Sequence, residues 1–191
     1  MRCQQRMKYR KIKDELKEFA NEVKNANGQN VLDLGCGSGI QSKQLIDEGL
    51  KVVGLDISPK MVAEARKRVP RAEFVVGDMA KLPFKKDSFD GVYARASLLH
   101  IPKDLIPKVL GLISKILVNG GYFYLALKKG QGEGEVEDER HERKVRRFFS
   151  FFNEEEVEDL LKDSGFNVEK INTLQRLDGS TIWIQVLARK S

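Results

Sequence analysis

The sequence VLDLGCGSGI, from Val31 to Ile40, joins a short strand-like run to a loop with glycine at every second position. The glycines are Gly35, Gly37 and Gly39, and Asp33 stands two residues before the first of them. Backbone without side chains lets a ligand approach closely, although such a loop also occurs as a purely structural tight turn. Its context in the chain therefore decides what it indicates.

Short apolar runs alternate with helix-like segments after residue 30. The pattern predicts strands at 31–34, 51–57, 72–78, 89–96 and 121–128, with helices at about 38–48, 59–69 and 103–117 between them. Strands alternating with helices are typical of right-handed crossovers and a parallel sheet. The glycine loop would then lie at the carboxyl ends of the strands, where open sheets bind ligands.

The last part of the chain predicts a helix and two further strands. Asn153 is a helix cap and Gly165 a stop signal. Residues 167–174 and 181–190 flank the turn signal Asp178-Gly179, which predicts an antiparallel final pair. The sheet therefore has seven strands, and the VNGG segment at 118–121 is expected to form the turn before the fifth.

The domain organisation is simple. A chain of 191 residues suits one domain with a sizeable core. An apolar stripe predicts a leading helix over about residues 8–24, so we divide the chain into an N-terminal helix at 1–28, packing on or flanking the domain, and a single domain at 29–191. Residues 129–152 form an unusually long connection within it.

Composition excludes several classes of protein. Charged residues make up 32% and apolar residues 41%, and no apolar run is long enough to cross a bilayer or serve as a secretion signal, so we expect a cytoplasmic protein without membrane contact. Two cysteines and two distant histidines support neither a disulfide framework nor a metal site. Of the net charge of +6, +4 lies in the first twenty residues, where a solvated helix face is favoured over nucleic-acid binding.

The ligand is indicated by the acids around the loop. A dinucleotide site usually has the spacing G-x-G-x-x-G, whereas this loop has G-x-G-x-G. Asp33 would oppose a pyrophosphate but suits a cationic ligand. Asp56, about twenty residues after the loop, ends a strand where a carboxylate can accept hydrogen bonds from both ribose hydroxyls, a role that NAD sites share.

The motifs VLDLGCGSG, VVGLDIS, GDM and SFDGVYARASLLHIP together resemble the class I S-adenosylmethionine-dependent methyltransferases, in particular their type 11 group. The resemblance covers about residues 31–128. It implies a Rossmann-like, doubly wound, three-layer α/β/α fold whose seven-stranded, mostly parallel sheet has an antiparallel last strand. It also implies S-adenosyl-L-methionine as cofactor and S-adenosyl-L-homocysteine as product. The cofactor-binding residues would be Asp33, Gly35, Cys36, Gly37, Gly39, Asp56, Ile57, Asp78, Met79, Arg95 and Ala96.

Each acid has a plainer alternative as a helix cap or solvated turn. In the family, Asp78 receives the adenine amino group beside the Met79 backbone, and Asp33 faces the methionine amino end of the cofactor. His100 is the only plausible histidine base, yet the LLHIP segment is equally a structural element of the family, and we favour the structural interpretation. Catalytic residues are otherwise not predicted.

The long connection at residues 129–152 is the candidate acceptor site. We interpret residues 129–152 as a lid beside the cofactor site, in which basic residues precede four phenylalanines. Cations beside aromatic rings can hold an anionic molecule or stack bases. The alternative is that the phenylalanines are core and the charges a solvated face. The candidate acceptor residues are His100, Arg143, Arg146 and Arg147.

Three functions follow from these observations. The preferred one is methyl transfer to a small-molecule acceptor by a monomer or homodimer. A tRNA methyltransferase of the wobble-uridine type, with RNA as partner, is the second. A noncatalytic cofactor-binding activator of a partner subunit is the third.

Overall fold

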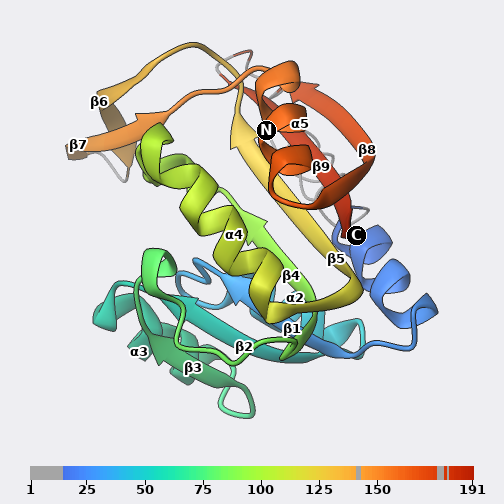
Figure 1. Cartoon of the computed structure of the whole chain (residues 1–191). Coiled ribbons are helices and arrows are strands. Elements are labelled where there is room, and N and C mark those ends of the chain that lie inside the picture. The colour runs from blue at the N-terminus through green and yellow to red at the C-terminus, as the bar shows by residue number, and fades with distance from the viewer. Residues whose placement is uncertain (1–14, 141–142, 176–178, 180) are drawn as a thin grey trace.

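A seven-stranded sheet with helices on both faces makes up the protein (Figure 1). The computed structural model describes residues 15–140, 143–175, 179 and 181–191. The sheet order is β3-β2-β1-β4-β5-β9-β8. Its strands are β1 (Asn30–Leu34), β2 (Lys51–Asp56), β3 (Glu73–Val76), β4 (Phe89–Arg95), β5 (Leu117–Lys128), β8 (Phe166–Gln175) and β9 (Ile182–Lys190). The first five strands pair in parallel, and β9 pairs antiparallel with both β5 and β8, which confirms the predicted fold class.

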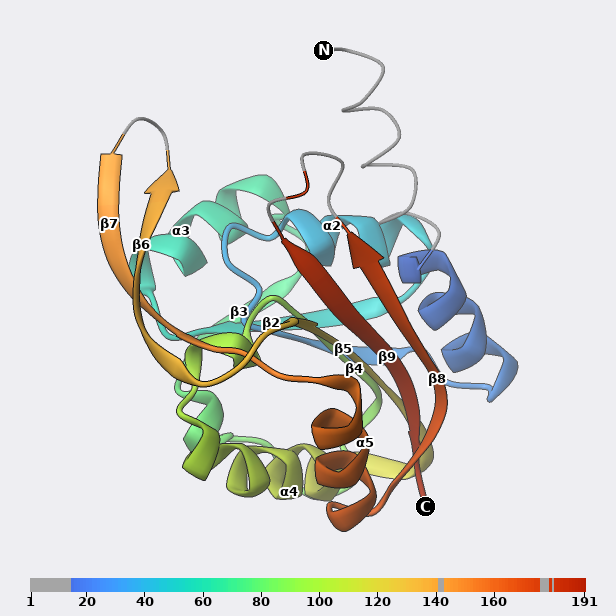
Figure 2. The same ribbon diagram turned by 90° about the horizontal axis from the view of Figure 1, so that it is seen from above.

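The helices form two layers that bury the sheet between them (Figure 2). Helices α4 (Ile106–Ile116) and α5 (Glu154–Asp163) cover one face with the largest apolar cluster. Helices α2 (Ile40–Asp47) and α3 (Pro59–Arg68) and the leading helix cover the other face. The short 3-10 turns η1 (Met79–Lys81), η2 (Leu98–His100) and η3 (Lys103–Leu105) follow strand ends or precede α4. Among the described residues, no helix is long and apolar enough to cross a membrane.

Predicted caps and stripes explain where the helices lie. The described part of the leading helix covers residues 15–25, and its apolar stripe of Leu16, Phe19, Ala20 and Val23 is buried against the sheet. The Ser58 hydroxyl accepts a hydrogen bond from the Met61 amide, and the Asn153 side chain accepts one from the Glu156 amide. Residues 1–14, which include the first part of the predicted leading helix, and most of the turn predicted at 176–180 lie outside the described residues.

The prediction of a turn at residues 118–121 was wrong in one respect, because this segment belongs to β5. Leu117 pairs with Phe89, and Tyr122 pairs with Gly91. Residues 118–121 therefore stand opposite Asp90 alone, and Gly120 has a φ of 75°. The segment bulges out of the ladder instead of preceding it, since glycine accepts the left-handed backbone that the bulge requires.

A β-hairpin outside the main sheet was not predicted. Residues of the long connection form β6 (Glu133–Arg140) and β7 (Arg143–Ser150), which pair antiparallel in a separate two-stranded sheet. The hairpin leaves the carboxyl end of β5 and projects from the body of the protein (Figures 1 and 2). At its base, the Gly130 amide donates to the Phe152 carbonyl over 2.9 Å. The hairpin is thus joined to the domain beside the carboxyl edge of the sheet.

Candidate functional site

The glycine loop is tied to the end of the neighbouring strand β2. The amides of Gly35 and Cys36 both donate to the Leu55 carbonyl, over 2.7 and 3.0 Å. Gly35, Gly37 and Gly39 have φ values of 77°, 53° and 77°. Glycine adopts this left-handed conformation easily, whereas it is strained for residues that have a Cβ. A Cβ added to Gly37 would meet no heavy atom within 4 Å. Among the described residues, open space therefore lies beside Gly37, whereas Gly35 and Gly39 pack closely against Ser97 and Ala65.

Asp56 lies directly beside this loop. Its carboxylate accepts one hydrogen bond of 2.9 Å from the Gly37 amide and another of 2.9 Å from the Ser58 amide, one at each oxygen. An ionised carboxylate offers about four acceptor positions, so about two of them remain for hydroxyl groups of a ligand. This accounting fits a ribose with two vicinal hydroxyls.

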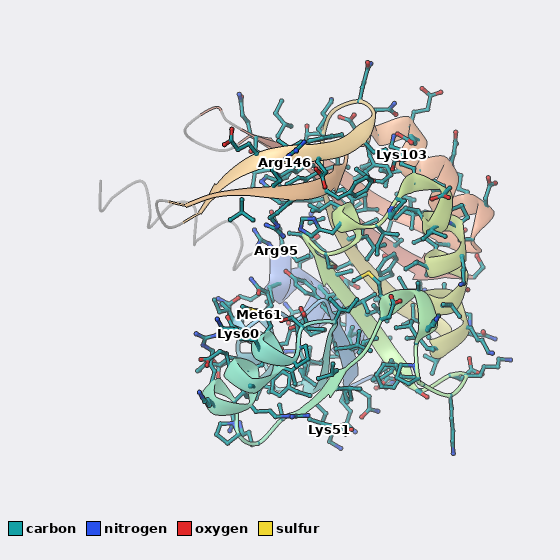
Figure 3. All side chains as sticks on the ribbon, turned by 90° about the vertical axis from the view of Figure 1, so that its left-hand side faces the viewer. Lys51, Lys60, Met61, Arg95, Lys103 and Arg146 are labelled. Carbon is teal, nitrogen blue, oxygen red and sulfur yellow. The ribbon has the colours of Figure 1, made fainter. Side chains whose placement is uncertain are left out.

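Apolar side chains are exposed around Asp56. Ile57 is 71% exposed, Val76 stands opposite Asp56 in the pairing of β2 with β3, and Met61 lies on the first turn of α3 (Figure 3). Val76 and Met61 are 46% and 38% exposed. Large apolar groups gathered at an exposed strand edge are typical of a ligand-binding surface. They suit the flat face of an adenine ring.

Asp78 follows the third strand as the cap of η1. One of its oxygens accepts a hydrogen bond of 2.8 Å from the Ala80 amide. The second oxygen has no hydrogen-bond partner among the described residues, so the capping role and the acceptance of an amino group are compatible. Met79 is half-buried directly after it.

Asp33 is buried under the loop and is held by α2. The Ser42 hydroxyl donates to it over 2.5 Å. Burial raises the pKa of Asp33 from 3.8 to about 7, against the opposing effect of the hydrogen bonds from Ser42. Burial also raises the pKa of the Cys36 thiol, so this cysteine is a packed thiol and not a nucleophile. Asp33 can respond to a cationic group at the loop by releasing its proton.

Residues 95–97, which we call the β4 turn, carry two unsatisfied polar atoms. Ala96 has a φ of 57° although it is not glycine. Arg95 Nε and Ser97 Oγ are buried, and no described residue offers either atom a hydrogen-bond partner. A Cβ added to Gly35 would lie 2.3 Å from the Ser97 Cβ, so the turn packs directly against the glycine loop. Strained backbone and unpaired buried polar atoms together are typical of functional sites.

The Arg95 guanidinium lies over the indole of Trp183, with 5.8 Å between Cζ and the ring centroid. Figure 3 shows Arg95 between the hairpin, where Arg146 is labelled, and helix α3, where Met61 is labelled. No local pattern pointed to Trp183, because β9 reaches Arg95 only through its insertion beside β5.

His100 links the end of β4 to the hairpin. Its Nδ1 lies 2.8 Å from the Phe148 carbonyl and its Nε2 lies 2.6 Å from an Arg147 nitrogen. A carbonyl only accepts, so Nδ1 donates; the guanidinium only donates, so Nε2 accepts. The imidazole is therefore neutral, and its basic nitrogen is engaged. This arrangement favours the positioning role that we expected over a role as a base.

The candidate arginines of the hairpin face different ways. Arg146 is exposed and pairs with Glu135 over 3.3 Å, whereas Arg147 contacts His100 and lies 5.4 Å from the Phe149 centroid. Arg143 lies in β7, but its side chain is outside the described residues. Phe149 and Phe152 are core, while Phe148 and Phe151 are half-buried. The interpretation as cations beside aromatic rings thus fits Arg147 and Phe149, and the interpretation as core phenylalanines with a solvated charged face fits Phe152 and Arg146.

No group of three or more potential metal ligands occurs in the part of the chain that the structure describes.

Comparison with known proteins identifies the domain. The family model described as a methyltransferase domain matches residues 31–121. The chain is 41% identical over 101 residues to the demethylmenaquinone methyltransferase of Beutenbergia cavernae, covering 52% of this chain and 40% of that protein. The chain spans 35% to 46% of the length of the first curated relatives that it matches.

Two solved structures share the fold. The PH0226 protein of Pyrococcus horikoshii superposes with a TM-score of 0.73 at 25% identity, covering 96% of this chain and 91% of that one. The 1,6-didemethyltoxoflavin-N1-methyltransferase of Burkholderia thailandensis superposes with a TM-score of 0.73 at 21% identity, covering 93% and 78%. The latter was solved with 1,6-didemethyltoxoflavin and S-adenosylhomocysteine bound.

Proposed function

Since the chain belongs to the class I S-adenosylmethionine-dependent methyltransferases of the type 11 group, we propose that it transfers a methyl group from this cofactor to a small organic acceptor. Two similar proteins support a small acceptor, since their names specify demethylmenaquinone and 1,6-didemethyltoxoflavin as what they methylate. A cytoplasmic location and the division into 1–28 and 29–191 remain predictions.

The single observation that carries the proposal is the coupling of Asp56 to the glycine loop. The carboxylate accepts from the Gly37 amide and keeps acceptor positions for two hydroxyls, beside a glycine that leaves the backbone open to a ligand. Ile57 and Val76 offer apolar surface on the adenine side, and Asp78 offers a carboxylate oxygen. Asp33 lies under the loop, where a charged carboxylate would stabilise a cationic amino group.

When bound, S-adenosylmethionine would supply a sulfonium methyl group. A lone pair of the acceptor would form a bond to the methyl carbon while the carbon–sulfur bond breaks, and the electron pair of that bond would stay on sulfur. The acceptor would lose its proton to solvent. The protein's part is alignment and exclusion of water. The glycine loop and Asp56 would orient the cofactor, and the β4 turn would face the acceptor, with His100 of η2 and Arg147 of β7 beside it.

Titration calorimetry with S-adenosylhomocysteine and with NAD tests cofactor identity. We expect heat from S-adenosylhomocysteine alone, and an Asp56→Asn variant should bind it about 10- to 100-fold more weakly, the usual effect of losing hydrogen bonds to a charged group. Asp47→Asn is the matched control, since Asp47 is an exposed carboxylate that pairs with Lys43 on α2. Binding of NAD without S-adenosylhomocysteine would contradict the proposal.

A transfer assay tests the reaction itself. Tritiated methyl groups from S-adenosylmethionine should appear in the small-molecule pool of a cell extract and not in its RNA or protein pools. Label in the RNA pool would favour the tRNA alternative. Cofactor binding without transfer to any pool would favour the noncatalytic alternative.

A further inference from the structure

The β4 turn contains buried polar atoms that the described residues around it leave without hydrogen bonds. Arg95 Nε and Ser97 Oγ are both buried, and neither has a hydrogen-bond partner among the residues that the structure describes. An unsatisfied buried polar group destabilises a protein, and such atoms are normally paired with protein, water or a ligand. Two of them in three residues, on either side of a strained alanine, indicate that something is held at this turn.

The geometry around Arg95 indicates what it can hold. The Arg95 Cζ lies 5.8 Å from the Trp183 ring centroid, and within the described residues Arg95 makes no ion pair with a carboxylate within 4 Å. A cation–aromatic contact of this kind leaves the N–H groups of a guanidinium available to a ligand. A planar carboxylate, or a phosphate, matches that fork with two parallel hydrogen bonds.

Further cations and rings continue this surface toward the hairpin. Lys128 stands opposite Trp183 in the pairing of β5 with β9, and its ammonium lies 3.7 Å from the Phe149 centroid. Arg147 and His100 also contact the Phe149 ring. Three cations are thus interleaved with two aromatic rings along one edge, which favours a ligand that is both negatively charged and flat.

The β4 turn lies beside the proposed cofactor site, where a methyl acceptor would bind. The Ser97 Cβ packs against Gly35, whose backbone belongs to the proposed cofactor wall. A molecule bound by Arg95 and Ser97 would therefore lie beside the glycine loop that is proposed to hold the cofactor.

We propose that the β4 turn and Trp183 form the acceptor subsite of this protein, and that the subsite selects a small planar anion, an aromatic carboxylate or phosphate, through Arg95. This inference rests on the proposed methyl transfer and deepens it by naming the class of acceptor. It moves the anion-binding role from Arg146, which pairs with Glu135 on the exposed face of the hairpin, to Arg95.

A structural role for Arg95 is the main competitor. Arg95 lies near a buried polar group formed by Tyr93, Tyr124 and Glu15, in which the Tyr124 hydroxyl donates to Glu15 over 2.9 Å. If Arg95 served only to balance Glu15, an Arg95→Gln variant would lose thermal stability and keep its choice of acceptor. Stability and acceptor charge must therefore be measured on the same variant.

Arg189 provides a matched control. Its guanidinium lies 5.6 Å from the Tyr122 centroid, much as Arg95 lies over Trp183, but at the opposite end of β9. Arg189→Gln removes a comparable cation–aromatic contact away from the site. A difference in acceptor methylation between the two variants then reflects the location of Arg95 and not merely the loss of an arginine.

The first experiment separates the small-molecule pool of an extract by ion exchange into anionic, neutral and cationic fractions before the tritiated-methyl assay. We expect label in the anionic fraction, reduced about 10- to 100-fold by Arg95→Gln and less than about twofold by Arg189→Gln. The S-adenosylhomocysteine affinity should be unchanged in Arg189→Gln. An equal loss of that affinity and of label in Arg95→Gln would assign Arg95 to the cofactor, as the family resemblance implies, and would overturn its role in the acceptor subsite. Label in the neutral or cationic fraction, or in RNA, overturns the anionic subsite while leaving methyl transfer intact. Absence of S-adenosylhomocysteine binding overturns the proposed function itself.

The second experiment needs no natural acceptor, because Trp183 is the single tryptophan of the chain and lies in the subsite. With S-adenosylhomocysteine present, 4-hydroxybenzoate should change the fluorescence of Trp183 saturably, whereas the neutral 4-hydroxybenzamide should not. Arg95→Gln should weaken the 4-hydroxybenzoate response about 10-fold or more, and Arg189→Gln should not. Equal responses to the acid and the amide, or none to the acid, would contradict an anion-selective subsite.

Discussion

The Ser42 hydroxyl donates a hydrogen bond of 2.5 Å to the Asp33 carboxylate inside the core, two residues before the glycine loop begins. The contact joins α2 to β1 and places an ionisable group where water does not reach it. Asp33 is therefore both a part of the core and the group most sensitive to a charge arriving at the loop.

Stability should fall as the pH rises toward neutrality, because of Asp33. Its folded-state pKa of about 7 exceeds the ordinary 3.8, so the folded protein keeps a proton that the unfolded chain releases. This contribution is fully present below the unfolded pKa and is lost as the pH rises through the folded pKa. The thermal midpoint of Asp33→Asn should therefore rise relative to wild type by about 2 °C or more between pH 5 and pH 8. Asp47→Asn should show no such trend, and a constant difference for Asp33→Asn would contradict the burial effect.

Binding of S-adenosylhomocysteine should release protons near pH 7. The cationic amino group of this ligand favours the ionised form of Asp33, which is partly protonated in the free protein. Calorimetric enthalpies measured in phosphate and in Tris should therefore differ at pH 7. The difference should disappear in Asp33→Asn. If it persists in that variant, another group supplies the protons.

Gly37→Ala should weaken cofactor binding beyond its effect on folding. A methyl group at this position meets no protein atom within 4 Å but enters the space from which a ligand approaches the loop. Gly132→Ala is the control, since Gly132 also has a positive φ, of 74°, and no atom within 4 Å of an added Cβ. Both variants should lose about 1–2 kcal/mol of stability from left-handed backbone. Only Gly37→Ala should lose S-adenosylhomocysteine affinity, and equal affinities would remove Gly37 from the site.

His100→Asn should affect acceptor binding more than turnover. Its imidazole fixes the hairpin through the Phe148 carbonyl and Arg147, so the variant should raise KM and hasten tryptic cleavage in β7. Loss of a general base usually lowers kcat about 10²- to 10⁴-fold, whereas we expect less than about tenfold here. Steady-state kinetics with the natural acceptor decide between these outcomes. A large fall in kcat with unchanged KM would make His100 catalytic.

The strands, the caps and the family could be predicted from the sequence because their signals are local. Val31 to Gly39 carries both the buried strand and its loop, and Ser58 and Asn153 cap the helices that follow them. The hairpin could not be predicted from an apolar alternation, since β6 is almost entirely charged.

The pairing of Arg95 with Trp183 was also beyond the sequence. It depends on β9 lying between β5 and β8, so that two segments far apart in the chain meet at one edge. Arg146 and Arg147 are neighbours that differ in environment because adjacent residues of a strand point to opposite faces. Local patterns predicted the glycine loop, whereas the proposed acceptor subsite depends on contacts between distant segments.

The insertion of β9 between β5 and β8 also constrains when the chain can fold during synthesis. Strand β8 has no partner in the main sheet other than β9, which is translated after it. While residues 182–190 are still within the ribosome, β5 has an unpaired edge on that side and β8 cannot join the sheet. A nascent chain at this stage can pair β1 to β5 but exposes a long apolar edge, so chaperone contacts should concentrate there until β9 emerges.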